Sequence, residues 1–364
     1  MSPVGRRPVA VVSFAQAKNV RREEHRNEVE MLMPVVGEAL GAVGLGKDDM
    51  GFICSGSADY LVGAPFSFVT ALDAVGVWPP KRESHVEMDG AWALYEAWTL
   101  LQEGELDTAL VYCFGRSSPS QLGKVLALQL DPYVVAPLWP DPVALAALQA
   151  RALLDAGLAD ERAFAEVAAR SRRAALDNPY AQVAGDRSVE ELLADEYVVS
   201  PLRRHTLPPV SDGAAAVVLA AGDRAAELCE RPAWITGIDH RIDTPVLGAR
   251  DLTVSESTTL AARGAGVDAA AVEVAELHAP FAPQELVLRR ALGLGDAVSV
   301  NPSGGALAAN AMMVAGLTRI GEAARRVMDG TAGRALAHAT SGACLQQNLV
   351  CALAAEPSGA GKGA

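Results

Sequence analysis

Two carboxylates stand where a helix is expected to begin. Glu87 and Asp89 directly precede residues 90–104, whose apolar spacing predicts a helix. Acids at a helix start cap free N–H groups and complement the helix dipole, and a carboxylate can also move a proton in catalysis. Both roles are open for each of the two residues.

The histidines and cysteines hold the remaining reactive groups. The six histidines are scattered singly, without the spacing of a metal site. The five cysteines form no C-x-x-C pair, and their odd number indicates free thiols in a reduced, cytoplasmic setting. Cys344 is expected to be a structural thiol, the usual fate of a buried cysteine. The sequence therefore predicts no metal and no other cofactor on this chain.

Composition limits the class of protein. The 364 residues are half apolar, enough for two similar halves or two domains. Thirty-one basic and 44 acidic side chains leave a net charge of −13, which argues against a nucleic-acid partner. Residues 1–7 are short and polar, and no apolar run long enough to span a membrane follows. We therefore expect neither a signal peptide nor a membrane segment.

Apolar strands alternate with helical stretches along the chain. Runs at 7–15, 50–54 and 108–114 predict buried strands, and 28–42 predicts a helix. Strands that are apolar on both faces favour an α/β fold with a largely parallel or mixed sheet. A second block of this kind begins at Ala233.

Residues 117–209 have a different character and are called the inserted segment below. They are rich in proline, and Ala/Arg-rich stretches at 142–158 and 161–178 predict long helices before the next strand, 214–220. We expect three parts: 1–230 with the inserted segment, 231–355, and a disordered tail at 356–364.

Three stretches resemble signatures of the thiolase superfamily: Ser211-Asp212-Gly213, Glu276-Leu277-His278-Ala279-Pro280-Phe281 and Asn301-Pro302-Ser303-Gly304-Gly305. The resemblance runs from about Val9 to Val350. It implies a thiolase fold, an α/β architecture of two duplicated halves in five layers (αβαβα), with a helical loop domain inserted in the first half. It also implies association as dimers.

The reactive residues that these signatures normally frame are replaced. Glu87 stands in place of the family's nucleophilic cysteine, Asn310 stands near the place of its histidine, and Ala339 replaces a second cysteine. An amide can donate to a thioester oxyanion but cannot act as a base, and Asn310 could instead cap or pack a helix. The resemblance implies a protein that does not perform thiolytic acyl transfer.

Two histidines resemble those of the sterol carrier protein x thiolases. His278 could donate to a thioester oxygen or hold a water, and His338 lies in the last loop of the site. Either could instead be a packed, hydrogen-bonded histidine. The substrate-binding residues expected beside them are Ser303, Gly304, Ser341 and Cys344.

The whole chain resembles the actinobacterial thiolase-like lipid-transfer proteins of sterol side-chain breakdown, with stretches 30–34, 54–60 and 83–89 fitting one subgroup. This implies a carbon–carbon lyase that cleaves a β-hydroxyacyl-CoA by a retro-aldol reaction. The implied partners are a related thiolase-like subunit and a small OB-fold protein with a zinc ribbon, so any metal would belong to that partner.

One departure leaves two hypotheses. Active aldolases of the family have a tyrosine where this chain has Thr340, and Ser341 and Ala343 replace glycines. The chain is either a lyase subunit or a catalytically silent subunit that completes a heteromeric complex. As a lyase it would use His278 and Asn310 as oxyanion donors, with a proton shuttle chosen from Glu87, Asp89 and His338.

Overall fold

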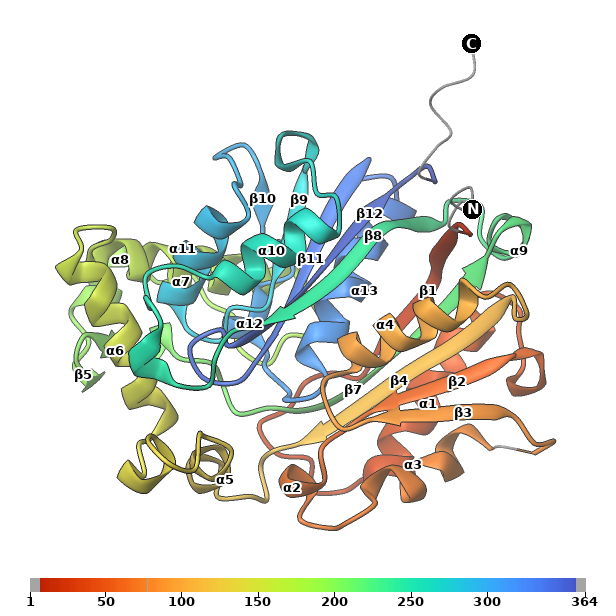
Figure 1. Ribbon diagram of the computed structural model, residues 1–364, viewed down its shortest axis with the longest axis horizontal. Coiled ribbons are helices and arrows are strands. Elements are labelled where there is room, and N and C mark those ends of the chain that lie inside the picture. Colours follow the sequence, from red (N-terminus) through yellow and green to blue (C-terminus); the bar gives the residue numbers. More distant parts are fainter. Residues whose placement is uncertain (1–6, 77, 358–364) are drawn as a thin grey trace.

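Strands and helices alternate through the computed structural model, which describes residues 7–76 and 78–357 (Figure 1). Ten strands form one sheet in the order β10-β9-β11-β12-β8-β1-β7-β4-β2-β3, and β5 and β6 form a small separate sheet. The strands are β1 (Val9–Gln16), β2 (Phe52–Gly56), β3 (Arg82–Val86), β4 (Thr108–Arg116), β5 (Tyr197–Val199), β6 (Leu202–Arg203), β7 (Asp212–Ala221), β8 (Ala233–Ile242), β9 (Val274–Leu277), β10 (Ser299–Val300), β11 (Arg334–Ser341) and β12 (Gln347–Ala354).

The large sheet consists of two halves with the same topology. β1-β7-β4-β2-β3 and β8-β12-β11-β9-β10 each begin with two antiparallel pairings and end with two parallel ones. β1 and β8 join the halves and pair only at Ala10–Trp234 and Val11–Ala233. The repeated order and direction confirm the expected duplication.

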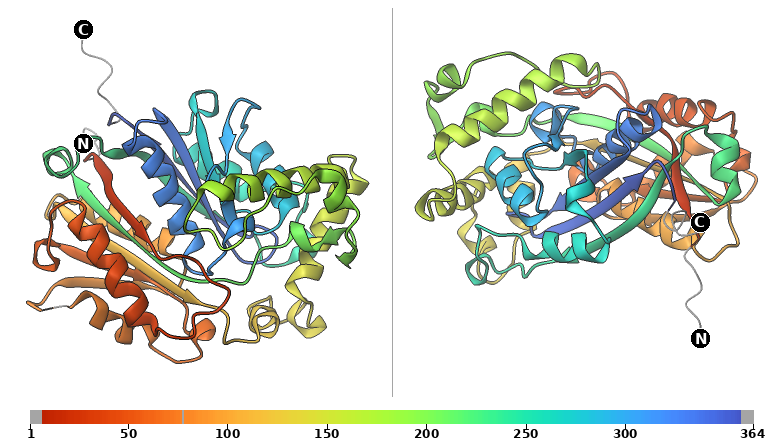
Figure 2. Two further views of the ribbon diagram at one scale, coloured as in Figure 1. Left: turned by 180° about the vertical axis from the view of Figure 1, so that it is seen from behind. Right: turned by 90° about the horizontal axis from the view of Figure 1, so that it is seen from above.

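Helices cover both halves and also separate them. They are α1 (Glu28–Gly41), α2 (Asp59–Val62), α3 (Ser67–Val75), α4 (Gly90–Leu101), α5 (Leu122–Leu128), α6 (Pro142–Asp155), α7 (Glu161–Ala174), α8 (Val189–Leu193), α9 (Asp223–Leu228), α10 (Glu256–Gly264), α11 (Ala282–Ala291), α12 (Gly305–Ala308) and α13 (Ala315–Met328). One apolar cluster joins α4 and α13 to both halves of the sheet. α1 and α3 cover the outer face of the first half (Figure 2), and α10 and α11 cover that of the second. These are the five expected layers.

Local sequence explains these elements. β4 and β7 are buried along almost their whole length because helices cover both of their faces. α1 begins at a capping box in which Asn27 and Glu30 satisfy each other's backbone N–H groups. The elements predicted at 28–42, 50–54 and 108–114 are confirmed, with ends shifted by at most two residues.

The inserted segment leaves the large sheet after β4 and returns at β7, and it contains α5 to α8 with the β5–β6 sheet. Its two predicted long helices are α6 and α7, which end three and four residues earlier than expected. α6 and α7 pack against α11 of the second half. Most of the predicted tail, 358–364, lies outside the described residues. Within the described residues, no helix has both the length and the apolarity to cross a membrane.

Candidate functional site

His278 follows β9 at the edge where the parallel strands β9 and β11 end. Its backbone N–H donates to the His338 carbonyl oxygen at 3.1 Å. Its ring Nδ1 lies 3.3 Å from the Thr340 backbone nitrogen, and its Nε2 lies 3.0 Å from Asn310 Oδ1. The structure therefore brings together two of the predicted site residues, His278 and Asn310.

Thr340 determines which nitrogen of the His278 ring carries the proton. A backbone N–H can only donate, so Nδ1 accepts from Thr340 and carries no proton. The proton of the neutral ring is then on Nε2, which donates to Asn310 Oδ1. Burial lowers the pKa of His278 to about 3, so the ring is neutral at pH 7. His278 is therefore a donor that holds the amide of Asn310.

The Asn310 amide is fixed with its N–H₂ group free. The residue is half-buried in the loop between α12 and α13, and its backbone N–H donates to Ser211 Oγ at 3.0 Å. Its Oδ1 accepts from His278, while its Nδ2 has no acceptor within the described residues. A preoriented, unpaired N–H donor can stabilise an oxygen that gains negative charge.

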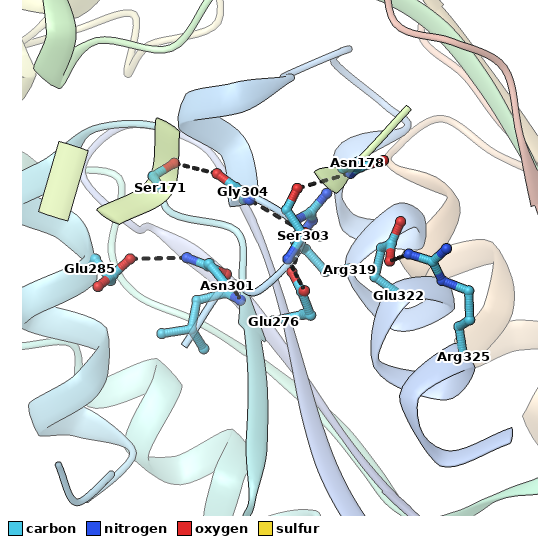
Figure 3. A network of polar contacts seen from close by, with 12 residues as sticks. Ser171, Asn178, Glu276, Glu285, Asn301, Ser303, Gly304, Arg319, Glu322 and Arg325 are labelled. Atoms are coloured by element: carbon cyan, nitrogen blue, oxygen red, sulfur yellow. Dashed lines mark hydrogen bonds and ion pairs between the residues drawn. The ribbon is translucent and has the colours of Figure 1, made fainter. Parts of the chain in front are cut away.

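A buried ion pair holds the backbone in front of His278 (Figure 3). Glu276 accepts from Ser303 N at 2.9 Å, from Ser303 Oγ at 2.7 Å and from Arg319 Nη1 at 2.8 Å. Burial raises the pKa of the Glu276 carboxyl, and the Arg319 charge opposes that rise. Next along β9, the Leu277 N–H donates to Asn301 Oδ1 at 2.6 Å. The Asn301–Gly305 motif therefore positions His278.

Ser303 and Gly304 have their polar groups occupied by the protein. The Ser303 carbonyl accepts from Asn178 Nδ2 at 2.8 Å, and the Gly304 carbonyl accepts from Ser171 Oγ (Figure 3). Gly304 has φ +94°, and a Cβ there would lie 2.7 Å from the side chain of Ala308. A glycine is therefore required where α7 meets this loop.

The two carboxylates before α4 lie in different environments. Asp89 is buried, and its oxygens accept at 2.9 Å from three backbone N–H groups, those of Ala91, Gly316 and Leu317. It therefore caps α4 and α13 together, and burial raises the pKa of its carboxyl.

Glu87 is exposed, accepts from Asp59 N at 2.6 Å and lies 3.3 Å from His85 Nε2. Of the two, Glu87 is the accessible carboxylate.

In the part of the chain that the structure describes, the side chains of three further predicted residues do not contact His278 or Asn310 through hydrogen bonds. His338 is fully buried, with Nε2 3.0 Å from Asn348 Oδ1, and burial lowers its pKa to about 4. Cys344 Sγ lies 3.4 Å from the Leu145 carbonyl oxygen, and burial raises the pKa of the thiol to about 11. The backbone of Ser341 pairs with Gln347 at the end of β11, and its side chain makes no hydrogen bond within the described residues. Within the described residues, no hydrogen bond joins these side chains to His278 or Asn310.

Sequence reasoning did not identify the partners that orient the site. Thr340 acts through its backbone N–H, which leaves no trace in residue type. Ser211 belongs to a fold motif, but its contact with Asn310 spans 99 residues of sequence and has no local signal. Within the described residues, no group of three or more His, Cys, Asp or Glu side chains is placed to bind a metal ion.

Curated thiolases are similar to parts of this sequence. The benzoylsuccinyl-CoA thiolase subunit BbsB of Thauera aromatica is 26% identical over 216 residues, 51% of this chain and 56% of that protein. The acetyl-CoA acetyltransferase of Methanothermobacter thermautotrophicus is 31% identical over 185 residues, 44% of this chain and 48% of that protein. The chain thus spans about half the length of the curated relatives it matches. No protein-family model matches it.

Solved structures are similar over nearly the whole chain. The Ltp2-ChsH2(DUF35) aldolase has a TM-score of 0.78 at 19% identity, covering 95% of this chain and 97% of that one. Human mitochondrial 3-ketoacyl-CoA thiolase has a TM-score of 0.77 at 16% identity, covering 96% and 98%. At these identities the likeness concerns architecture. With its duplicated sheet halves and central helix pair, the chain has the thiolase fold.

Proposed function

We propose that this protein is a lyase subunit that cleaves a β-hydroxyacyl-CoA by a retro-aldol reaction. The observation that carries the proposal is the Asn310 amide, which His278 holds with its Nδ2–H free. The aldolase among the structural neighbours supports the reaction class, and the similar thiolases support a CoA thioester as substrate. The resemblance to sterol-degrading relatives supports a branched sterol side chain as the acyl group.

The chemistry needs one base and one oxyanion donor. Glu87 takes the proton of the β-hydroxyl, the Cα–Cβ bond breaks, and the β-carbon leaves as an aldehyde or ketone. The electron pair of that bond passes through Cα to the thioester oxygen, where Asn310 Nδ2–H stabilises the enolate. Returning the proton to Cα gives the shortened acyl-CoA. Ser303 and Gly304 contribute by positioning His278, and Ser341 remains the proposed contact for substrate.

The chain that follows Glu87 contacts the loop that carries Asn310. Glu87 lies three residues before the start of α4, and the Gly90 N–H at the start of that helix donates to the Met313 carbonyl oxygen at 2.9 Å. Met313 belongs to the loop that carries Asn310. The other proposed proton shuttles, Asp89 and His338, are buried with partners, so we assign the base to Glu87.

The alternative, a catalytically silent subunit, is favoured by Thr340. Its hydroxyl donates to the Gln347 carbonyl oxygen at 3.0 Å, so this residue offers no free acid where aldolases of the family have a tyrosine. In that case the chain would complete a complex with a related thiolase-like subunit and an OB-fold protein. The DUF35 component of the neighbouring Ltp2-ChsH2(DUF35) aldolase supports the expectation of a partner protein.

Variants of the assembled complex distinguish the two functions. The complex is incubated with a branched β-hydroxyacyl-CoA of a sterol side chain, and the released carbonyl compound is measured. Asn310→Ala should lower kcat about 100- to 1000-fold, as loss of an oxyanion donor does. His278→Ala should act through the same amide, so the double variant should lose little more activity than either single variant.

The proposed base is tested separately. Glu87→Gln should abolish turnover, whereas Glu83→Gln, an equal charge change on β3, should not. Unchanged turnover in all of these variants would establish the silent role.

A further inference from the structure

A cavity of about 330 Å³ lies inside the inserted segment, between α7, α8 and the chain that leads to β7. Three arginines line it, Arg172 from α7, Arg187 from the loop before α8 and Arg204 from the return chain, together with Asp195 and His205. Figure 1 places α7 and α8 at the end of the molecule remote from β3. None of the predicted site residues lines this cavity.

The charges around the cavity do not balance. Asp195 is held by Arg187 through two hydrogen bonds of 2.9 Å, and its carboxylate also lies 3.5 Å from His205 Nδ1. Burial lowers the pKa of His205, which keeps that ring neutral. Three arginines and one aspartate therefore leave a net charge of 3 − 1 = +2. The uncompensated pair is Arg172 and Arg204.

Neither arginine of this pair has a counter-ion. Within the described residues, the guanidinium groups of Arg172 and Arg204 make no ion pair and no hydrogen bond, and Arg172 Nε is buried without a partner. Burial and the nearby Arg204 charge lower the pKa of Arg172 to about 10. Arg172 lies in the last turn of α7, where a positive charge complements the helix dipole, and it is half-buried. A partly buried charge that has no counter-ion and lies near a like charge is stabilised when an anion binds.

We propose that this cavity is a binding site for a phosphate group, which Arg172 and Arg204 hold together. Two guanidinium groups match the oxygens of a phosphate in charge and in hydrogen-bonding geometry. Free inorganic phosphate and the phosphates of a CoA ligand share this chemistry. The site does not depend on the proposed reaction, because binding alone defines it.

The cavity walls continue to the candidate active site. On one side, the Gln182 and Val183 N–H groups donate to the Ala308 carbonyl oxygen at 3.2 and 3.0 Å, two residues before Asn310. On the other, the chain that includes Leu207 runs on to Ser211, which accepts from the Asn310 N–H. An anion in the cavity would therefore fix the positions of both chain segments that hold the backbone at Asn310.

The test is calorimetric titration of the full chain at constant ionic strength, with inorganic phosphate and with CoA as separate probes. Arg204→Gln and Arg172→Gln should each weaken binding about tenfold or more, since each removes a charge-assisted hydrogen-bond donor. Arg151→Gln is the matched control, because Arg151 lies on α6 of the same segment and pairs with Asp155. Its binding should equal that of the wild type. Binding of either probe with this pattern supports the site, and the probe that binds identifies the source of the phosphate.

Thermal unfolding gives a second readout. Without phosphate, Arg172→Gln should unfold at a higher temperature than the wild type because it removes a partly buried charge that has no counter-ion. Added phosphate should raise the midpoint of the wild type but not that of the variant. If Arg172→Gln does not fold, Arg204→Gln decides the question, since Arg204 is exposed. No binding of either probe, or equal binding by wild type and Arg204→Gln, would overturn the proposal.

Discussion

Two buried histidines meet at the ends of β9 and β11, and neither is charged at neutral pH. Burial lowers the pKa of His278 to about 3 and that of His338 to about 4. His278 donates to Asn310, and His338 bonds to Asn348 on the neighbouring strand β12. Each ring therefore serves as a neutral hydrogen-bonding group, and its protonation would leave a positive charge in the sheet.

These histidines should make the protein less stable at acidic pH. An unfolded histidine binds a proton below about pH 6.5, whereas the folded rings stay neutral to about pH 4 or below. Their contribution to the free energy of unfolding is therefore complete above about pH 6.5, and it is lost as the pH falls toward the pKa values of the folded rings. For His338 the loss is on the order of 3 kcal/mol. Urea unfolding between about pH 7 and 4.5 should show a weaker pH dependence in His338→Gln. Exposed His25→Gln is the control, and equal slopes in all three proteins would contradict the prediction.

At the scale of elements, the middle layer depends on contacts between helix starts. α4 and α13 pack together between the two sheet halves, and Asp89 binds the first N–H groups of both. α13 has no capping side chain of its own, because its N-cap is Val314. One carboxylate thus satisfies donors that would otherwise be buried without acceptors.

Asp89→Ala should therefore cost more than the loss of an ordinary cap. Three backbone donors lose their acceptor, so we expect a loss of about 2–4 kcal/mol in the free energy of unfolding. Asp160→Ala is the matched comparison because Asp160 caps only α7, through Ala163 N at 2.7 Å. That variant should lose about 1 kcal/mol. Equal losses in urea unfolding would show that Asp89 does not stabilise both helices.

The close approach of α13 to β1 gives a second test at this scale. A Cβ at Gly321 would lie 2.2 Å from the Phe14 ring, whereas a Cβ at Gly37 on α1 would meet nothing within 4 Å. Gly321→Ala should lower the free energy of unfolding by about 1–3 kcal/mol through overpacking. Gly37→Ala should raise it by about 0.5–1 kcal/mol through helix propensity. Opposite signs are expected in the same unfolding assay, and equal signs would contradict this packing.

At the scale of the whole molecule, four of the five cysteines are buried. Cys351 faces the middle layer from β12, and burial raises the pKa of its thiol to about 12. Cys229 is half-buried after α9. Thiol reactivity therefore reports the opening of the fold as a whole.

A thiol reagent such as dithiobisnitrobenzoate should react rapidly with Cys229 alone in the native protein. After unfolding, all five free thiols should react. Cys229→Ser should remove the native reaction and leave four thiols on unfolding. Rapid native labelling of Cys344 would instead show that the loop after β11 opens in solution, which would weaken the case for a fixed Thr340 beside His278.

Much of the fold follows from the sequence because its signals are local. Alternating apolar strands and helices predicted the α/β class, and cap residues such as Asn27 and Asp89 mark the helix starts. The site could be predicted only in part. His278 and Asn310 lie in motifs, but Asp89 meets Gly316 across 227 residues of sequence. Whether a carboxylate caps or catalyses depends on such distant partners, as does the tautomer of His278.

The double cap at Asp89 bears on how a duplicated fold can specialise. The repeated halves place the starts of α4 and α13 against each other, so a single acid serves both copies of the helix. The second copy of the helix therefore needs no capping side chain of its own, and its N-cap is Val314. This asymmetry in structural support leaves the loop before α13, which carries Asn310, free of the constraint that a cap residue would impose.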